Sequence, residues 1–129
     1  MIVVDSSVWI ARLRGESTPA LRRLDEVFRP RDVIVGDLVM LEVLQGARDE
    51  RHAAHLERLL RAFRVEEMVD EAVSLSAARH SRILRDKGVT VRKTIDLLIA
   101  SFCIERGYAL LHQDRDFDLM ALHVPLVLA

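Results

Sequence analysis

The sequence is poor in cysteine, glycine and aromatic residues. It has one cysteine, five glycines, one tryptophan and one tyrosine among 129 residues. A lone Cys103 excludes an intramolecular disulfide, and its apolar surroundings predict a packed core thiol rather than a nucleophile. No G-x-G-x-x-G or Walker pattern occurs, which excludes a glycine-rich phosphate loop. Few aromatic side chains are available as stacking platforms for nucleic-acid bases.

Long apolar runs and long runs of like charge are also missing. No stretch is long enough to span a bilayer, and Asp5 stands where a secretory apolar region would continue. We therefore expect a cytoplasmic protein with no membrane partner. Half of the residues are hydrophobic and 30% are charged, so a single globular domain over residues 1–129 is expected. The net charge of -1 does not by itself indicate a nucleic-acid partner.

Short apolar runs alternate with helical patterns along the chain. Strands are predicted at residues 2–4, 33–35, 65–69, 108–111 and 124–128. Helices are predicted at 8–13, 18–29, 38–47, 50–63, 71–87, 94–106 and 114–122, with Ser6 or Ser7, Thr18 and Thr94 as caps. This order predicts an α/β domain whose mainly parallel sheet is covered by helices on both faces.

Four acids fall where such a sheet places its functional crevice, beyond the carboxyl ends of the strands. Asp5 ends the first strand, and Asp114 follows the strand that contains Leu111. Glu42 and Asp96 interrupt otherwise apolar helical segments. A structural explanation exists for each alone, because Asp5 could cap a helix, Asp96 could face a helix dipole and Glu42 could face water. Four such coincidences together favour a cluster that needs compensating cations.

Oxygen ligands of this kind suit Mg²⁺ or Mn²⁺ better than zinc. His52 and His55 lie three residues apart but lack a third ligand, so a solvated helix face is the better interpretation. A serine hydrolase is disfavoured because Ser6 and Ser7 have no His–Asp partners at credible spacing. A phosphatase with an Asp nucleophile usually needs a second Asp two residues on, where Ser7 stands.

The blocks around these acids resemble the four signature blocks of PIN-domain ribonucleases of the VapC type. The first strand ends in Val3-Val4-Asp5-Ser6-Ser7, and an acidic helix reads Leu41-Glu42-Val43-Leu44-Gln45-Gly46. The third block is Thr94-Ile95-Asp96-Leu97-Leu98-Ile99-Ala100, and the fourth is Leu111-His112-Gln113-Asp114-Arg115-Asp116-Phe117. One block is a weak signal, but four in this order over the whole chain are strong.

The resemblance implies a three-layer α/β/α sandwich with a five-stranded sheet of order 3-2-1-4-5. It implies a Mg²⁺- or Mn²⁺-dependent endoribonuclease with Asp5, Glu42, Asp96 and Asp114 as catalytic and metal-binding acids. Asp116 competes with or supplements Asp114 as a ligand, or is simply an acid in the first turn of a helix. Ser7 is expected to hydrogen-bond an active-site carboxylate. His112 stands where many members carry Thr. It could approach the substrate or orient Asp114, but a structural role without direct contact to the metal is favoured.

Partners are also implied by the resemblance. Arg92 and Lys93, near Asp96, are candidates for RNA phosphates, whereas Arg79, Arg82, Arg85 and Lys87 could equally form a solvated face. A VapB-type antitoxin would inhibit the enzyme by wrapping it, and homodimers are usual. Its groove could include an apolar set that could equally be core: Trp9, Ile10, Leu13, Leu24, Val39 and Val43. The alternative function is a non-catalytic PIN-like RNA-binding or assembly module with an inert pocket.

Overall fold

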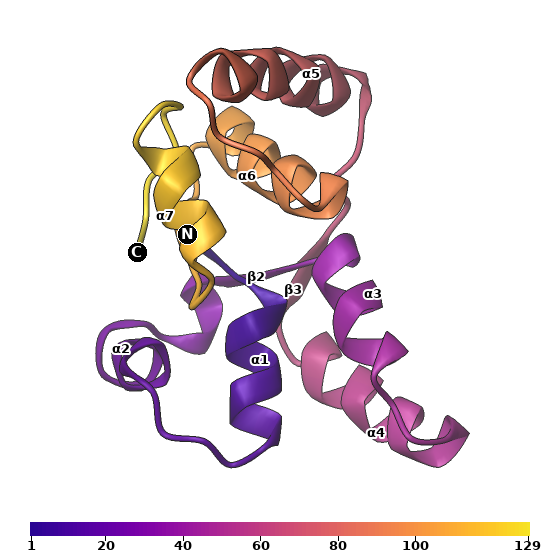
Figure 1. Cartoon of the computed structure of the whole chain (residues 1–129). Helices are drawn as coiled ribbons and strands as arrows, with labels where there is room; N and C mark the ends of the chain where they lie inside the picture. The colour runs from indigo at the N-terminus through magenta and orange to yellow at the C-terminus, as the bar shows by residue number, and fades with distance from the viewer.

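A parallel four-stranded sheet forms the centre of the computed structural model, which describes residues 1–129 (Figure 1). The strands are β1 (Ile2–Val4), β2 (Val33–Gly36), β3 (Arg64–Glu66) and β4 (Ala109–Leu111). Their order is β3-β2-β1-β4, and Val3 of β1 pairs with Ile34 on one side and Leu110 on the other. These three paired side chains are fully buried, as expected for a sheet covered on both faces.

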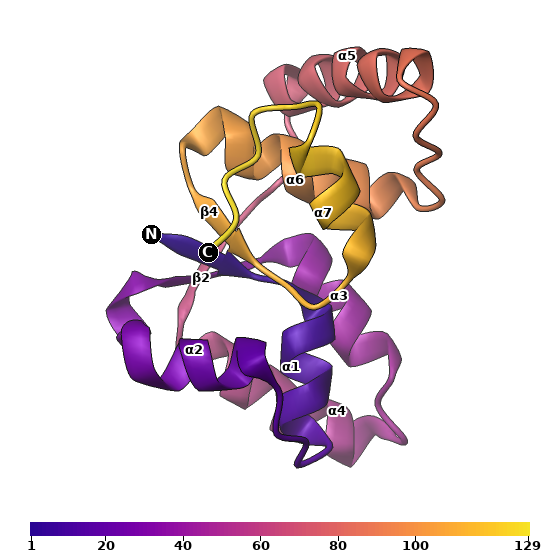
Figure 2. The same cartoon turned by 60° about the vertical axis from the view of Figure 1, so that its left-hand side comes forward.

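Helices cover both faces of this sheet, which confirms the predicted α/β/α arrangement. Four follow one another through the first half: α1 (Ser6–Leu13), α2 (Pro19–Val27), α3 (Asp37–Gln45) and α4 (Glu50–Arg61). Three belong to the second half: α5 (Glu71–Asp86), α6 (Thr94–Arg106) and α7 (Arg115–Ala121). α3 contacts both α1 and α4, whereas α5 packs along α6 above the opposite face (Figures 1 and 2). None of these helices combines the length and apolar character needed to cross a bilayer.

The predicted fifth strand at residues 124–128 is wrong in extent. This segment does lie beside β4, but only Leu128 pairs with Leu110, in a single parallel bridge. Pro125 has no amide hydrogen to donate, and the amide of Leu126 donates instead to the carbonyl of Val124 at 2.8 Å. A local turn therefore replaces most of the ladder, and the sheet has four strands.

Helix ends follow the sequence signals with two corrections. Thr18 caps α2, and Gly107 ends α6 in the left-handed region at φ 69°, where its lack of a Cβ removes the steric cost. However, Asp5 rather than Ser6 or Ser7 caps α1. Lys93 occupies the N-cap position of α6, without a side-chain cap, and Thr94 is the first helical residue.

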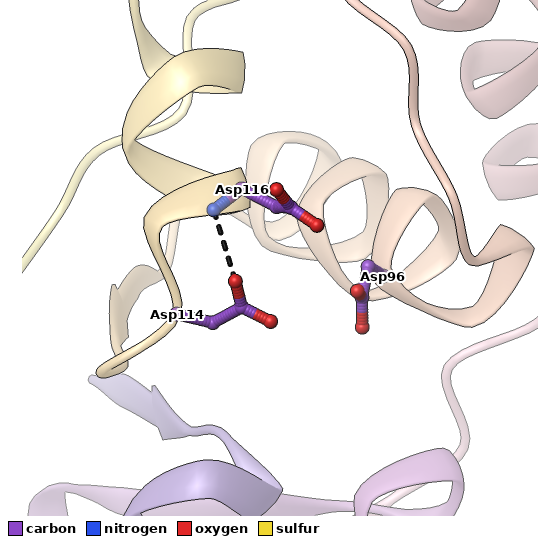
Figure 3. Close-up of side chains that lie close together, drawn as sticks. All are labelled: Asp96, Asp114 and Asp116. Atoms are coloured by element: carbon purple, nitrogen blue, oxygen red, sulfur yellow. Dashed lines mark hydrogen bonds between the residues drawn. The ribbon is translucent and has the colours of Figure 1, made fainter.

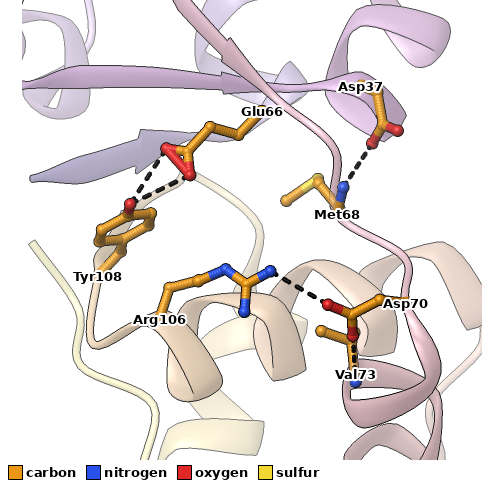
Figure 4. Close-up of polar contacts among 7 residues, drawn as sticks. All are labelled: Asp37, Glu66, Met68, Asp70, Val73, Arg106 and Tyr108. Carbon is orange, nitrogen blue, oxygen red and sulfur yellow. Dashed lines mark hydrogen bonds and ion pairs between the residues drawn. The ribbon is translucent and has the colours of Figure 1, made fainter.

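A network of polar contacts lies on the side of the molecule where β3 leads into α5 (Figure 4). The Tyr108 hydroxyl donates to the Glu66 carboxylate at 3.1 Å, and Arg106 donates to Asp70 at 3.1 Å. Asp70 also caps α5 through the amide of Val73. These bonds tie the C-terminal end of α6 to β3 and to the start of α5, so α6 is fixed along the sheet. The fixed helix determines where Asp96, in its first turn, lies.

Candidate metal centre

Asp5 lies where β1 ends and α1 begins. Its Oδ2 atom accepts hydrogen bonds from the Ser7 hydroxyl at 2.6 Å and from the Ser7 amide at 3.1 Å, as an N-cap does. The side chain is buried, yet Oδ1 has no hydrogen-bond partner. Capping therefore explains one oxygen of Asp5 and leaves the other available to a ligand.

Asp96 lies in the first turn of α6 and is only 4% exposed. Its Oδ2 atom is buried and also has no hydrogen-bond partner. An acid that merely complemented the helix dipole would be hydrated or would accept from the helix amides. A buried carboxylate oxygen without a partner is costly, and a cation beside Asp96 would offset that cost.

The start of α7 brings two more acids to Asp96 (Figure 3). Asp114 caps this helix, its Oδ1 atom accepting from the Asp116 amide at 2.9 Å. One carboxylate oxygen each from Asp96, Asp114 and Asp116 lies within 4.8 Å of the others. Both Asp114 and Asp116 thus supply an oxygen to the cluster, and the first-turn position of Asp116 does not direct it away.

Glu42, in the middle of α3, faces the same region from another element. The Ser6 hydroxyl donates to its Oε1 atom at 3.2 Å, so both serines that follow Asp5 hold carboxylates. The sequence predicts only a capping role for Ser6. Asp5 caps α1 instead, which leaves the Ser6 hydroxyl free to bind Glu42.

Electrostatic coupling indicates that these acids lie near one another. Burial and the negative charge of Asp5 raise the pKa of Asp96 from 3.8 to about 7, with smaller contributions from Glu42 and Asp114. Burial and Asp5 also raise the pKa of Glu42. The positive charge of Lys93 lowers the pKa of both Asp96 and Glu42, which indicates that this charge lies near the acids. Arg92 is exposed on the same segment and makes no ion pair.

The donor set fits a hard divalent cation. Every candidate ligand is a carboxylate, with no histidine or cysteine in the cluster. Mg²⁺ and Mn²⁺ prefer oxygen ligands, and such an ion would satisfy the unpartnered oxygens of Asp5 and Asp96 while offsetting the mutual repulsion. The tight cluster contains Asp96, Asp114 and Asp116, and Asp5 and Glu42 adjoin it.

Ser7 and His112 form hydrogen bonds that position residues of the cluster. The Ser7 hydroxyl, besides donating to Asp5, accepts from the amide of Gln113 at 3.3 Å and so links the ends of β1 and β4. The Nδ1 atom of His112 accepts from the amide of Asp114 at 3.0 Å, which assigns the ring proton to Nε2. Nε2 faces the Asp118 carboxylate at 3.4 Å, a contact that the sequence interpretation did not foresee.

A concave surface lies away from these acids, between α1, α2 and α4. It is an apolar groove of about 520 Å³ whose walls include Trp9, Leu13, Leu24 and Val43. The Trp9 indole donates to the carbonyl of Val4 at 3.1 Å and packs against Phe63 at the edge of the core. Two residues predicted for this groove do not line it: Val39 is fully buried, and Ile10 lies elsewhere on α1.

Comparisons with known proteins agree with this architecture. A model of the PIN domain matches residues 2–122. Ribonuclease VapC11 of Mycobacterium tuberculosis is 35% identical over 127 residues, which cover 94% of this chain and 92% of that protein. The structure of VapBC2 from Rickettsia felis, bound to a DNA fragment from their promoter, aligns with a TM-score of 0.80 at 17% identity. This alignment covers 100% of this chain and 98% of that chain. A toxin–antitoxin complex from Klebsiella pneumoniae aligns with a TM-score of 0.72 at 13% identity, over 91% of this chain and 90% of that chain.

Proposed function

The chain belongs to the VapC ribonucleases of the PIN-domain family, and from that premise we propose that it is a metal-dependent endoribonuclease toxin restrained by an antitoxin. The observation that carries the metal dependence is the pair of buried, unpartnered carboxylate oxygens on Asp5 and Asp96. A site that had lost its function would have no reason to keep this electrostatic cost. The names of the relatives support ribonuclease activity.

The acids of the cluster are proposed to have different roles in binding cations and water. Asp5 and Asp96 are proposed as direct ligands, joined by Asp114 and Asp116, while Glu42 holds a second ion or positions the attacking water. A divalent ion bound there would acidify a coordinated water and offset charge on the phosphate. Ser7 holds Oδ2 of Asp5, which leaves Oδ1 available to an ion, and Ser6 holds Oε1 of Glu42. Lys93 and Arg92 supply positive charge for the RNA phosphates beside the cut.

Metal removal tests the proposed activity. Labelled RNA incubated with the protein and Mg²⁺ or Mn²⁺ is expected to be cut internally, and excess EDTA is expected to reduce cleavage to the background of the buffer. Gel separation of the products measures both. Undiminished cleavage in EDTA would overturn the metal-dependent mechanism, and metal binding without cleavage would favour the inert RNA-binding alternative.

We further propose that the apolar groove receives a segment of the antitoxin. The groove offers Leu24, Phe28 and Leu59 as contacts from two helices, and its rim carries the ion pair between Arg12 and Asp25. Apolar walls with a charged rim suit an amphipathic helix. The toxin–antitoxin complexes of the same fold support such a partner, and family membership supports a homodimer, which sedimentation of the purified chain would test.

A charge placed in the groove is expected to weaken this complex. Leu59 lines the groove yet is 44% exposed, so Leu59→Glu disturbs the groove without emptying the core. Affinity for the protein encoded by the adjoining reading frame is expected to fall at least about tenfold, roughly 1.4 kcal/mol. Calorimetric titration measures the change. Leu75→Glu on α5, at a 63% exposed position outside the groove, is the matched control. Equal affinities for the two variants would exclude the groove as the binding site.

A further inference from the structure

Positive charge is concentrated between residues 79 and 93, although the whole chain has a net charge of -1. This segment contains a single acid, Asp86, and six basic residues: Arg79, Arg82, Arg85, Lys87, Arg92 and Lys93. All six are exposed, and none forms an ion pair within 4.0 Å. Unpaired arginines such as Arg51 also occur elsewhere, but no other segment of this length holds so many basic residues beside a single acid. The segment therefore presents uncompensated charge that suits a polyanion.

The last turn of α5 and the following loop form a polar recess of about 250 Å³. Its walls include Arg85 with the hydroxyl residues Ser81 and Thr90, while Gly88 makes the turn at φ 74°. The recess thus combines a guanidinium with two hydroxyl donors, the groups that commonly contact phosphate oxygens.

The loop beyond the recess has free backbone donors as well. The amides of residues 90–93 form no hydrogen bond with any backbone or side-chain acceptor, whereas the amide of Val89 donates to Leu84 at 2.8 Å. Four consecutive unpaired amides next to exposed basic side chains can bind anionic oxygens without reading bases. Aromatic side chains that could stack on bases are missing from residues 79–93.

The segment that carries these groups leads along the chain to the metal centre. In Figure 2 the segment that follows α5 descends along one side of the molecule to the start of α6, where Lys93 precedes Asp96 by three residues. Seven residues, 87–93, separate α5 from α6 and span about 25 Å at most. An RNA strand of a few nucleotides could therefore reach from the acids to the recess.

We infer that the RNA strand runs from the metal centre along residues 88–93, and that the recess at Ser81, Arg85 and Thr90 binds one of its phosphates. This inference rests on the proposed ribonuclease function and adds a binding site outside the acidic pocket. Contacts to phosphate rather than to bases make its contribution independent of sequence and sensitive to salt. The recess should therefore affect the binding of long RNA and leave the chemical step unchanged.

Binding of a labelled 20-nucleotide RNA tests the inference without any cleavage. In the Asp96→Asn background with EDTA, fluorescence anisotropy over a KCl series should show about fivefold weaker binding for Arg85→Ala. The slope of log affinity against log salt should fall by about 0.7, one phosphate contact. Arg51→Ala is the matched control, because Arg51 is exposed and unpaired on α4, at the opposite end of the molecule from α5 (Figure 1). Equal losses for the two variants would overturn the proposed site.

A cleavage assay separates this inference from the proposed function. With Asp96 intact and Mn²⁺ present, Arg85→Ala should lower kcat/KM for the 20-nucleotide RNA about fivefold but leave a dinucleotide substrate unaffected. An equal loss on the dinucleotide would place Arg85 in the chemistry and overturn the inference. If the unaltered protein cleaves neither RNA, the proposed function fails while the anisotropy result still decides the binding site. A polyglutamate peptide that binds as tightly, with the same dependence on Arg85, would indicate a protein partner and overturn the RNA assignment.

Discussion

Replacing Asp96 by Asn is expected to abolish RNA cleavage while the fold survives. The change removes one formal charge from the middle of the carboxylate cluster and keeps the size of the side chain. A metal ion contributes several kcal/mol to stabilising charge in the transition state, so its loss corresponds to a decrease in kcat/KM of about 10³-fold or more. Cleavage of labelled RNA in saturating Mn²⁺ measures this effect.

The same variant should fold at least as stably as the parent without metal. Asp96 is buried close to Asp5, Glu42 and Asp114, and a neutral amide relieves the repulsion between them. Thermal unfolding in EDTA measures this, and Glu105→Gln provides a control on the exposed side of the same helix. Cleavage at the parental rate by the folded Asp96→Asn protein would remove Asp96 from the mechanism.

The order of strands and helices was predictable because apolar periodicity determines which segments enter the core. Val3, Ile34 and Leu110 lie on strands that pair as neighbours, and each of these runs is short, apolar and bounded by polar residues. The residues around 124–128 look the same by composition. There, Pro125 and a local turn at Leu126 prevent a ladder, a competition between backbone hydrogen bonds that periodicity does not reveal.

The acids could be singled out for two other physical reasons. Asp5 and Asp114 follow strands at the edge where a parallel sheet forms its crevice, whereas Glu42 and Asp96 interrupt apolar helical segments at a desolvation cost. Neither reason could rank Asp116 against Asp114. Their relative positions depend on how α7 begins, where the Asp114 carboxylate accepts from the Asp116 amide. The Ser6 contact with Glu42 was equally beyond reach, because it joins residues 36 positions apart through the packing of α1 on α3.

The stabilising effect of Mn²⁺ is expected to increase steeply with pH between about 5 and 7. The pKa of Asp96 is about 7 in the folded chain, against an ordinary value of 3.8. Without metal, the folded chain therefore binds more protons than the unfolded chain between these values. The contribution of Asp96 to the free energy of unfolding is complete below pH 3.8 and is lost as the pH rises through 7. Metal binding needs the ionised form, so its affinity changes in the opposite direction.

The two opposing dependences determine how large a change in Tm is expected. At pH 7.5, Mn²⁺ at one hundred times its Kd would add about 2.7 kcal/mol to the free energy of unfolding, or about 8 °C in Tm. At pH 5 only about 1% of Asp96 would be ionised, so the same Mn²⁺ concentration would add about 0.4 kcal/mol, or about 1 °C. Thermal unfolding with Mn²⁺ and with EDTA, from pH 5 to 7.5, measures the difference. Glu105→Gln should retain this dependence and Asp96→Asn should lose most of it, because Asp96 has a pKa of about 7 and couples a proton to the bound ion across this range. A Tm difference that stays constant with pH in the unaltered protein would show that the ion is held without Asp96.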